Sequence, residues 1–361
     1  MKAIRELYDS RSLPPWDPKT CYIYYEDSIY DGKPYFLPIV VLRTRPCNWL
    51  VKGGGCLMCD YQRVAALKDR DIDELDIISQ AEWALKHLKP NERFPYVHIA
   101  SSGSTLDSKE ISDYVLVKLL KLAEQVGVKT FGLETRPEFL LDTNRLDLME
   151  ENFNGNFSVG IGLESSDEFI RHYCINKGFR IKTFDSAVEA LIKRNIEFFS
   201  YVLLGKPFLT VKEDVEDAVR SIRYSLRKGG LALLMVANLQ PNTLTHWLWK
   251  RDMYDVPSLW AAIRVLELLE PEERGKVAVK AFDKAVPMPH HFAASCGKCT
   301  STIRNALVGF NFTADFNVLE SVSDICDCKR DWEEKFEYEP ELSLRERVTR
   351  SYERIARELN I

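Results

Sequence analysis

The stretch Ile39-Val-Val-Leu-Arg-Thr-Arg-Pro-Cys47-Asn-Trp-Leu-Val-Lys-Gly-Gly-Gly-Cys56-Leu-Met-Cys59 joins a short apolar run to three closely spaced cysteines. The run at 39–42 is continuous and mostly β-branched, which is typical of a parallel strand covered on both faces. In parallel α/β folds, ligand-binding residues gather at the carboxyl ends of strands, and these cysteines follow such an end. The stretch therefore predicts a parallel α/β fold with a metal site at one edge of its sheet.

An alternation of apolar strands and amphipathic helices continues along the chain. Six strands are predicted, at 36–43, 96–101, 130–133, 157–163, 197–203 and 231–237. Helices are predicted at 73–88, 111–126, 167–173, 183–194, 211–228 and 257–269. Such β/α units with short connections favour a parallel sheet with helices outside it. Two further units that a complete (β/α)8 barrel needs are not evident, so we expect an α/β fold built on a partial (β/α)6 barrel.

Three regions are predicted along the chain. Residues 1–34 are rich in Pro, Asp and Tyr and are interpreted as an irregular N-terminal lead-in. Residues 35–274 form the predicted barrel. The alternation ends after position 270, and residues 275–361 are predicted to form a small, α-rich C-terminal domain that carries a four-cysteine metal site.

Composition excludes some classes of protein. The chain has 361 residues and a net charge of −5, with both signs mixed throughout. It contains no apolar run of roughly 18 residues, which a membrane-spanning helix needs, and its start lacks the apolar stretch of a signal peptide. We therefore expect a cytoplasmic protein with no membrane partner. The charge neither favours nor excludes an RNA substrate.

Seven of the nine cysteines fall into tight groups, which in a long cytoplasmic protein indicates metal ligation rather than disulfides. Cys21 and Cys174 stand alone and are interpreted as small buried apolar residues. The second group is Cys296, Cys299, Cys326 and Cys328. Four thiolates are typical of a closed structural zinc site. A second iron–sulfur cluster and uncoordinated cysteines are the alternatives, and His290 and His291 are possible substitute ligands.

The first group offers three thiolates, Cys47, Cys56 and Cys59, which can hold three irons of a [4Fe–4S] cluster and leave the fourth open. The alternative is a zinc site with a fourth ligand from elsewhere, because Cys-x2-Cys spacing does not choose the metal. Polar residues also follow the other predicted strands, at 101–105, 134–137, 164–166, 206–207 and 238–240. They suit a zwitterionic, ribose-bearing ligand, although polar residues after strands also form turns and helix caps.

These residues resemble the radical S-adenosylmethionine (SAM) superfamily, in which three cysteines follow the first strand of a partial barrel. The eight-residue gap between Cys47 and Cys56 resembles the branch that includes the Elp3-type proteins. A narrower resemblance is to the archaeosine-forming radical SAM lyases that act on archaeal transfer RNA. The stretches that carry it lie at 52–59, 133–138, 160–165, 203–208, 243–249 and 296–299.

The resemblance implies a chemistry and a set of partners. A [4Fe–4S] cluster on the three cysteines and SAM are the implied cofactors, with Zn²⁺ expected at the second cysteine group. Reductive cleavage of SAM gives a 5′-deoxyadenosyl radical, which abstracts hydrogen from the lysine side chain of a lysine-preQ0 base at position 15 of tRNA. Cleavage of a C–N bond then leaves archaeosine. The implied partners are tRNA, an electron donor such as ferredoxin, and the enzyme that transfers lysine to the tRNA.

The resemblance also implies roles for single residues. Ser102, Gly103 and Ser104 stand where the superfamily holds the SAM amino group, and Met58 where the backbone meets adenine. The candidates for contacts with SAM or substrate are Glu134, Arg136, Glu164, Asn238 and, for the substrate alone, Lys206. Arg136 suits the SAM carboxylate through a bidentate fork, with a structural ion pair as the alternative.

Two other functions remain open from the sequence. One is a radical SAM enzyme with a different small-molecule or protein substrate. The other is a non-catalytic protein that binds RNA and holds two zinc ions. Lys298, Arg304, Lys329 and Arg330 lie near the second cysteine group and are candidates for tRNA phosphate contacts, or simply a solvated charged face.

Overall fold

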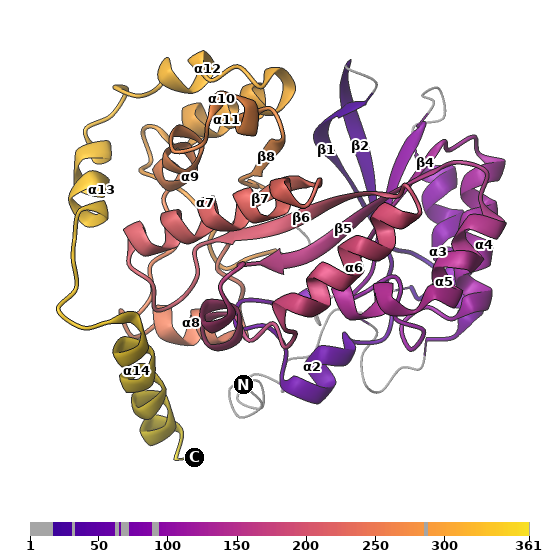
Figure 1. Cartoon of the computed structure of the whole chain (residues 1–361), viewed down its shortest axis with the longest axis horizontal. Helices are drawn as coiled ribbons and strands as arrows, with labels where there is room; N and C mark the ends of the chain where they lie inside the picture. The colour runs from indigo at the N-terminus through magenta and orange to yellow at the C-terminus, as the bar shows by residue number, and fades with distance from the viewer. Residues whose placement is uncertain are drawn as a thin grey trace.

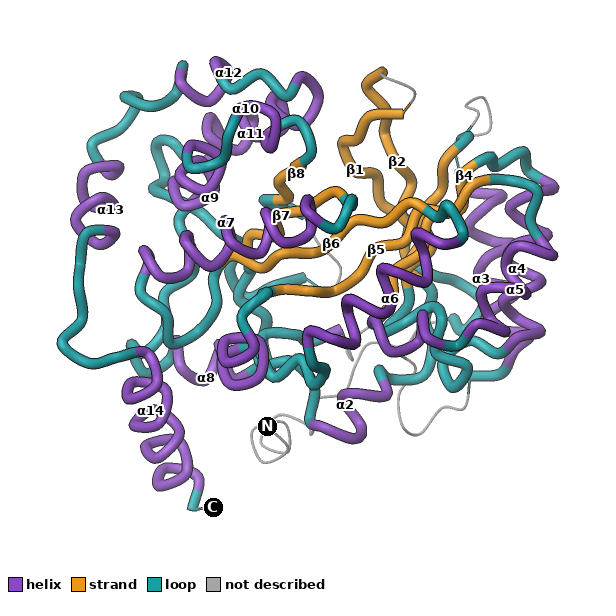
Figure 2. Tube along the Cα trace, viewed as in Figure 1, coloured by secondary structure: helices purple, strands orange, loops and turns teal. Residues whose placement is uncertain are grey.

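The centre of the molecule is an eight-stranded sheet that curls into a half barrel (Figures 1 and 2). The structure is a computed structural model that describes residues 17–30, 33–61, 65, 72–88, 94–284 and 288–360. The strands lie in chain order: β1 (Tyr22–Tyr30), β2 (Lys33–Val41), β3 (Tyr96–Ala100), β4 (Thr130–Thr135), β5 (Asn156–Glu164), β6 (Glu197–Leu204), β7 (Leu231–Val236) and β8 (Val277–Lys280). The β1–β2 pair is antiparallel, and β2 through β8 are parallel.

Helices cover the outer face of the sheet, as the alternating pattern predicts (Figure 1). They are α3 (Glu74–His87), α4 (Asp113–Gln125), α5 (Thr143–Asn152), α6 (Ile181–Lys193), α7 (Val211–Arg227) and α9 (Leu259–Glu267). The start of α7 is fixed by a capping box between Thr210 and Glu213, and its inner face buries Val215, Ala218 and Ile222 against the sheet.

The six predicted strands are all present, and the predicted parallel α/β half barrel is confirmed. The apolar run that opens the pattern behaves as expected, since Val40 and Leu42 are fully buried in the core. One predicted helix differs in type: the segment expected at 167–173 contains a π-helical turn, η3 (Ile170–Cys174). The 3-10 turn η2 (Pro137–Leu141) and helix α5 were not predicted.

Two strands correct the sequence interpretation. Residues 22–30, expected to be part of an irregular lead-in, form β1, whereas residues 1–16 and 31–32 lie outside the described residues. An antiparallel edge strand needs only one covered face, so β1 lacks the apolar run that marks the parallel strands. The four-residue strand β8 extends the sheet beyond position 274, and it is too short to give a period.

The C-terminal part is rich in helices, as predicted. It contains α10 (Pro271–Arg274), α11 (Thr300–Thr313), α12 (Asn317–Glu320), α13 (Cys328–Phe336) and α14 (Leu344–Leu359). In Figure 1 these elements follow one side of the barrel, and α14 returns to the end where α8 (Leu244–Trp249) lies. Buried Val348 and Ile355 seat α14, and the Tyr352 hydroxyl donates to the Tyr173 carbonyl at 2.8 Å. In the described part of the chain, no helix combines the length and the apolar character that crossing a bilayer requires.

Candidate metal and cofactor site

The carboxyl ends of the parallel strands surround a cavity of about 280 Å³. The three cysteines of the first group, Cys47, Cys56 and Cys59, all line it. So do most of the predicted SAM or substrate contacts, namely Met58, Ser102, Gly103, Glu134, Arg136, Glu164 and Asn238. Its size lies near the lower end of the range for small-molecule sites in proteins. One cavity therefore brings together these residues from the ends of five strands, β2, β3, β4, β5 and β7.

The cysteine loop is held in place by contacts with the segment that follows η3. Cys47 precedes the short helix α2 (Asn48–Gly53), and the chain then turns through Gly54 and Gly55 with φ values of 77° and 73°. Such left-handed conformations favour glycine, which explains two residues of the Gly-Gly-Gly run. The side-chain amide of Asn176 donates to the carbonyls of Gly53 at 3.0 Å and Gly55 at 2.8 Å. The indole N–H of Trp49 donates to the Asn176 carbonyl at 2.7 Å.

The three thiols of the first group are arranged differently from those of the second group. Among the described residues, only the second cysteine group has three or more ligand atoms that all lie within 4.8 Å of one another. The thiols of Cys47, Cys56 and Cys59 do not gather into such a group and instead line the wall of the cavity. A [4Fe–4S] cluster places each thiolate on a different iron, so it suits a wider spacing.

Two buried polar atoms beside the thiols suit a zwitterionic ligand. Within the described chain, one terminal guanidinium nitrogen of Arg136 and the hydroxyl of Ser102 are buried without a hydrogen-bond partner. Buried polar groups are usually paired, and leaving one unpaired costs roughly 1–3 kcal/mol. An amino-acid ligand would supply both an acceptor for Arg136 and a partner for Ser102. The residues present therefore fit a cluster together with SAM.

Among the described residues, Arg136 forms the structural ion pair considered for it and keeps one buried nitrogen without a partner. Its Nε donates to Glu138 at 2.5 Å, which is the structural ion pair. The guanidinium carbon also lies 5.2 Å from the centroid of the Trp49 ring, and the side chain is only 7% exposed. The ion pair uses one edge of the fork and leaves a terminal nitrogen for a ligand.

Ser104 fixes the wall of the cavity and does not line it. Its backbone N–H donates to Glu110 Oε2 at 3.0 Å, and its hydroxyl accepts from the Arg136 backbone N–H at 3.1 Å. Burial raises the pKa of Glu110 to about 8, although its hydrogen bond from Ser104 acts in the opposite direction. Ser104 thus joins the loops after β3 and β4, which distinguishes it from its neighbours Ser102 and Gly103.

The two glutamates of the cavity have different partners. Burial raises the pKa of Glu134 to about 7, while a 3.1 Å hydrogen bond from the Tyr201 hydroxyl lowers it. Glu164 has a left-handed backbone, with φ of 63°, and its carboxylate lies 2.7 Å from Lys177 Nζ. A non-glycine residue in that region is strained, and such strain is common at functional sites.

Lys177 was missed by the sequence analysis. Burial lowers its pKa, but the charge of Glu164 outweighs this effect and the pKa is raised, so the group stays cationic. It lies in an irregular loop directly after Asn176, whose φ of 57° reverses the chain. Trp49 and the tyrosines 24, 61 and 201 also line the cavity and were not predicted. No local pattern marks these residues, because the fold brings them in from separate elements.

Lys206 corrects an expectation. Predicted to face the substrate, its side chain is instead fully buried, with Nζ 2.7 Å from Asp214 and 3.3 Å from Asp217 on α7. Burial lowers the pKa of Lys206, but the two carboxylates outweigh it and the pKa is raised. The side chain therefore ties the end of β6 to α7 and does not line the cavity that holds the cysteines.

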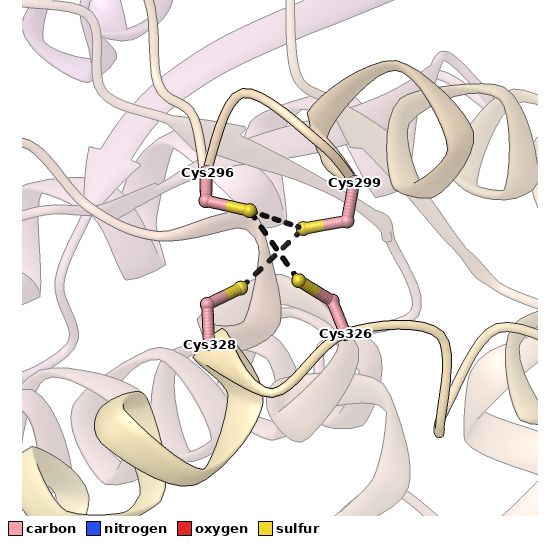
Figure 3. A group of neighbouring side chains, drawn as sticks. All are labelled: Cys296, Cys299, Cys326 and Cys328. Carbon is pink, nitrogen blue, oxygen red and sulfur yellow. Dashed lines mark hydrogen bonds between the residues drawn. The ribbon is translucent and has the colours of Figure 1, made fainter.

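The second cysteine group forms a compact four-sulfur cage (Figure 3). Cys296 lies 3.5 Å from Cys299 and 3.4 Å from Cys326, and Cys299 lies 3.4 Å from Cys328, measured between sulfurs. Zn–S bonds of about 2.3 Å in a tetrahedron place sulfurs about 3.8 Å apart, close to this spacing. The arrangement can hold a single metal ion with four thiolates.

One basic residue near this cage has a structural role. The guanidinium of Arg304, a candidate for phosphate contact, donates to the carbonyls of Ala281 and Ala293, each at 2.9 Å. These bonds tie α11 to the segment after β8. Lys329 lies 3.8 Å from Glu333, whereas Lys298 is exposed. Arg304 is therefore removed from the set of residues that were predicted to contact tRNA phosphates.

Comparison with known proteins gives a consistent result. No family model matches the chain. It is 29% identical to archaeosine synthase subunit beta of Methanosarcina acetivorans over 315 residues, 83% of this chain and 85% of that protein. It is also 29% identical to archaeosine synthase subunit beta of Thermococcus kodakarensis over 313 residues, 85% of this chain and 94% of that protein.

The structure is similar to an N-terminally truncated Elp3 of Methanocaldococcus infernus, with a TM-score of 0.50 and 13% identity. The alignment covers 75% of this chain and 62% of Elp3, so the chain spans less than two thirds of that protein. This likeness concerns the fold. Both predicted resemblances are confirmed as similarities: the sequence is similar to archaeosine synthase subunit beta, and the fold is similar to that of Elp3.

Proposed function

We propose that the chain is a radical SAM enzyme of archaeosine synthesis that cleaves a C–N bond of the lysine-preQ0 base at position 15 of tRNA. The observation that carries the proposal is the single cavity in which three cysteines lie beside a buried guanidinium nitrogen of Arg136 that lacks a partner. Similarity to archaeosine synthase subunit beta over 83% of the chain supplies the substrate class.

In this proposal Cys47, Cys56 and Cys59 bind the [4Fe–4S] cluster. When bound, the cluster and SAM together supply a 5′-deoxyadenosyl radical for hydrogen abstraction. The protein binds and orients the reacting groups and excludes water from them. Arg136 holds the SAM carboxylate through its available nitrogen, and Ser102 holds the amino group.

The remaining residues of the cavity are assigned contacts with either the cofactor or the substrate. Glu164, whose carboxylate lies 2.7 Å from Lys177 Nζ, is proposed to accept hydrogen bonds from ribose hydroxyls. The backbone at Met58 is proposed to contact adenine. Asn238 lines the cavity, and its side-chain oxygen accepts from the Ala293 backbone N–H at 2.9 Å; its amide nitrogen is proposed to donate to the substrate.

The second cysteine group is proposed to hold Zn²⁺ as a structural ion, since its sulfur spacing suits one tetrahedral centre. The proposed partners are tRNA, a low-potential electron donor such as ferredoxin, and a second protein that supplies the lysine-bearing tRNA. The name of the relatives, a subunit beta, supports an assembly with another chain. A cytoplasmic location follows from these partners.

A product assay under anaerobic, reducing conditions tests the proposed function. Reconstituted protein is mixed with SAM and either lysine-preQ0 tRNA or the matching free nucleoside, and digested products are identified by mass spectrometry. We expect archaeosine from the tRNA alone, accompanied by 5′-deoxyadenosine. Formation of 5′-deoxyadenosine without archaeosine would replace this substrate with another one. A protein that binds tRNA but never cleaves SAM would contradict the enzymatic proposal itself.

A further inference from the structure

Four aromatic rings form a cluster outside the cavity. They are Trp249 and His246 from α8, and His290 and His291 from the segment that follows the described residue Met288. Ring centroids of Trp249 lie 5.1 Å from His290 and 5.0 Å from His291, and the two histidines are 4.5 Å apart. His246 is buried beneath them, with its ring centroid 4.9 Å from His290. Trp249 is partly exposed and the other two histidines are exposed, so one face of the cluster is accessible.

Both segments that carry the cluster are hydrogen-bonded to the walls of the cofactor cavity. Leu239 exchanges backbone hydrogen bonds with the histidine segment: its N–H donates to His291 at 2.8 Å, and its carbonyl accepts from His290 at 2.7 Å. Its neighbours Asn238 and Gln240 line the cavity. At the other side, the Leu244 N–H donates to Leu57 at 2.9 Å, and Leu57 lies between Cys56 and Met58. The segments that carry the cluster are therefore bonded to residues that adjoin the cavity wall, one of them in the cysteine loop.

One cationic side chain lies beside the rings, and another lines the cavity. Lys250 follows Trp249 directly and is exposed, and Lys284, also exposed, lines the cavity itself. Burial, together with the charges of His291 and Lys250, lowers the pKa of His290, so that ring is uncharged at neutral pH. The three histidines do not form a metal site, because within the described residues only the four C-terminal cysteines gather three or more ligand atoms within 4.8 Å.

Many proteins that bind unpaired nucleic acid have accessible aromatic side chains next to lysine or arginine side chains. Bases stack on aromatic side chains, and the flanking cations attract the phosphate backbone. A base deep in folded RNA reaches a cavity only when it is turned out of its stack, and its neighbours are then also unstacked. A stacking surface on the rim of such a cavity is well placed to receive one of those neighbours.

We propose that Trp249, His290 and His291 form a stacking site for an unpaired nucleobase of the RNA substrate, next to the base that enters the cavity. The inference rests on the proposed function, because it takes RNA as the substrate. It adds a binding surface that lies outside the SAM cavity and apart from the four-cysteine site. The ligand class is a nucleobase, recognised through its π-face with little dependence on its identity.

The first test measures binding of an unmodified tRNA transcript to the reconstituted protein by fluorescence anisotropy. Trp249→Ala, and separately the double change His290→Ala with His291→Ala, should each weaken binding by about 5- to 100-fold. Trp249→Phe should restore binding to within about threefold of the wild type, because a ring is retained. Tyr114→Ala is the matched control: Tyr114 is 50% exposed on α4, and its removal should leave binding unchanged. The histidine variants keep the test valid if Trp249→Ala fails to fold.

The second test separates stacking from phosphate attraction. A transcript with one abasic nucleotide beside position 15 should bind the wild type more weakly than the intact transcript does. The double histidine variant should bind the abasic and the intact transcript equally. The slope of log affinity against log salt should be unchanged by the histidine changes and flattened by Lys250→Gln. Equal binding by wild type and all ring variants would overturn the inference. That result leaves the proposed function standing if the product assay still yields archaeosine, so the two failures are distinguishable.

Discussion

Gly103 lies directly against Cys47 in the candidate cluster site. A Cβ added at position 103 would lie 2.7 Å from the Cβ of Cys47 and 2.4 Å from Oε1 of Glu110. Both contacts are shorter than real Cβ atoms allow, and Glu110 is buried, so Cys47 must shift. The requirement for glycine here comes from the close approach of two loops and not from a left-handed backbone.

Gly103→Ala should therefore lower the iron and sulfide content of anaerobically reconstituted protein by about twofold or more, because overpacking displaces a ligand. Elemental analysis and the absorbance near 400 nm measure the loss. Gly275→Ala is the control, since nothing lies within 4 Å of a Cβ at that position. An alanine at position 103 with a full complement of iron would show that the loop tolerates the shift.

Arg136 is the residue on which the SAM proposal depends most. Removing its charge takes away a hydrogen bond to a carboxylate, so Arg136→Gln should weaken SAM binding by about 10- to 100-fold. Equilibrium dialysis under anaerobic conditions measures the change. Glu138→Gln removes only the ion-pair partner, which is 36% exposed, and should bind SAM within about threefold of the wild type. If Arg136→Gln binds SAM normally, the carboxylate is held elsewhere, and Lys177 becomes the first candidate.

At the scale of elements, the link between β6 and α7 depends on a buried charge. Lys206 compensates Asp214 and Asp217, and the side chain of Asp217 is fully buried. Removing the cation leaves a buried carboxylate unpaired, which typically costs 3–5 kcal/mol.

Lys206→Met should lower the free energy of unfolding by about 3–5 kcal/mol, measured by urea denaturation. Adding Asp214→Asn and Asp217→Asn should recover part of the loss, because no buried charge then remains. Lys212→Met, at the start of α7, removes only an exposed pair with Glu339 and should leave the midpoint unchanged. An unchanged midpoint for Lys206→Met would indicate that the carboxylates become protonated at little cost.

The elements differ in how far the sequence predicts them. Strands covered on both faces, such as β2, need continuous apolar runs, and such a run can be recognised from the local sequence alone. β1 is an antiparallel edge strand whose tyrosines and isoleucines favour a strand but form no continuous apolar run, and the four residues of β8 are too few to show a period. Lys206 was assigned wrongly for a related reason: a lysine after a strand looks the same whether it lines a cavity or pairs with carboxylates on a helix.

In the candidate site too, residues marked by a local sequence pattern are predictable, and residues positioned by tertiary contacts are not. The three cysteines and the polar residues after each strand are predictable, because parallel strands all end at one edge of the sheet. Lys177 and Trp49 enter through irregular segments whose positions depend on tertiary contacts such as those of Asn176. Their roles could not be read from spacing.

At the scale of the whole molecule, the four-cysteine cage joins parts of the C-terminal region that are distant in sequence. Cys296 and Cys299 lie at the start of α11, Cys326 and Cys328 at the start of α13, and Cys328 accepts from the indole N–H of Trp260 on α9 at 3.4 Å. A metal ion that closes such a loop contributes directly to folding.

Cys296→Ser should therefore abolish zinc binding and make the chain beyond α9 more sensitive to limited proteolysis, while the visible spectrum of the first site is retained. Metal analysis of the wild type is the check on metal identity. Zinc at one ion per chain is expected. A second complement of iron and sulfide in place of zinc would make this site an auxiliary cluster.

The central claim is that Cys47, Cys56 and Cys59 hold the cluster that cleaves SAM. Its most direct test is the quantity of 5′-deoxyadenosine formed per chain after anaerobic reconstitution and reduction with dithionite. Wild type and Cys296→Ser should both form it, whereas Cys47→Ala, Cys56→Ala and Cys59→Ala should each reduce it to background. A variant of any of these three that keeps near-normal 5′-deoxyadenosine formation with a full complement of iron would contradict the account.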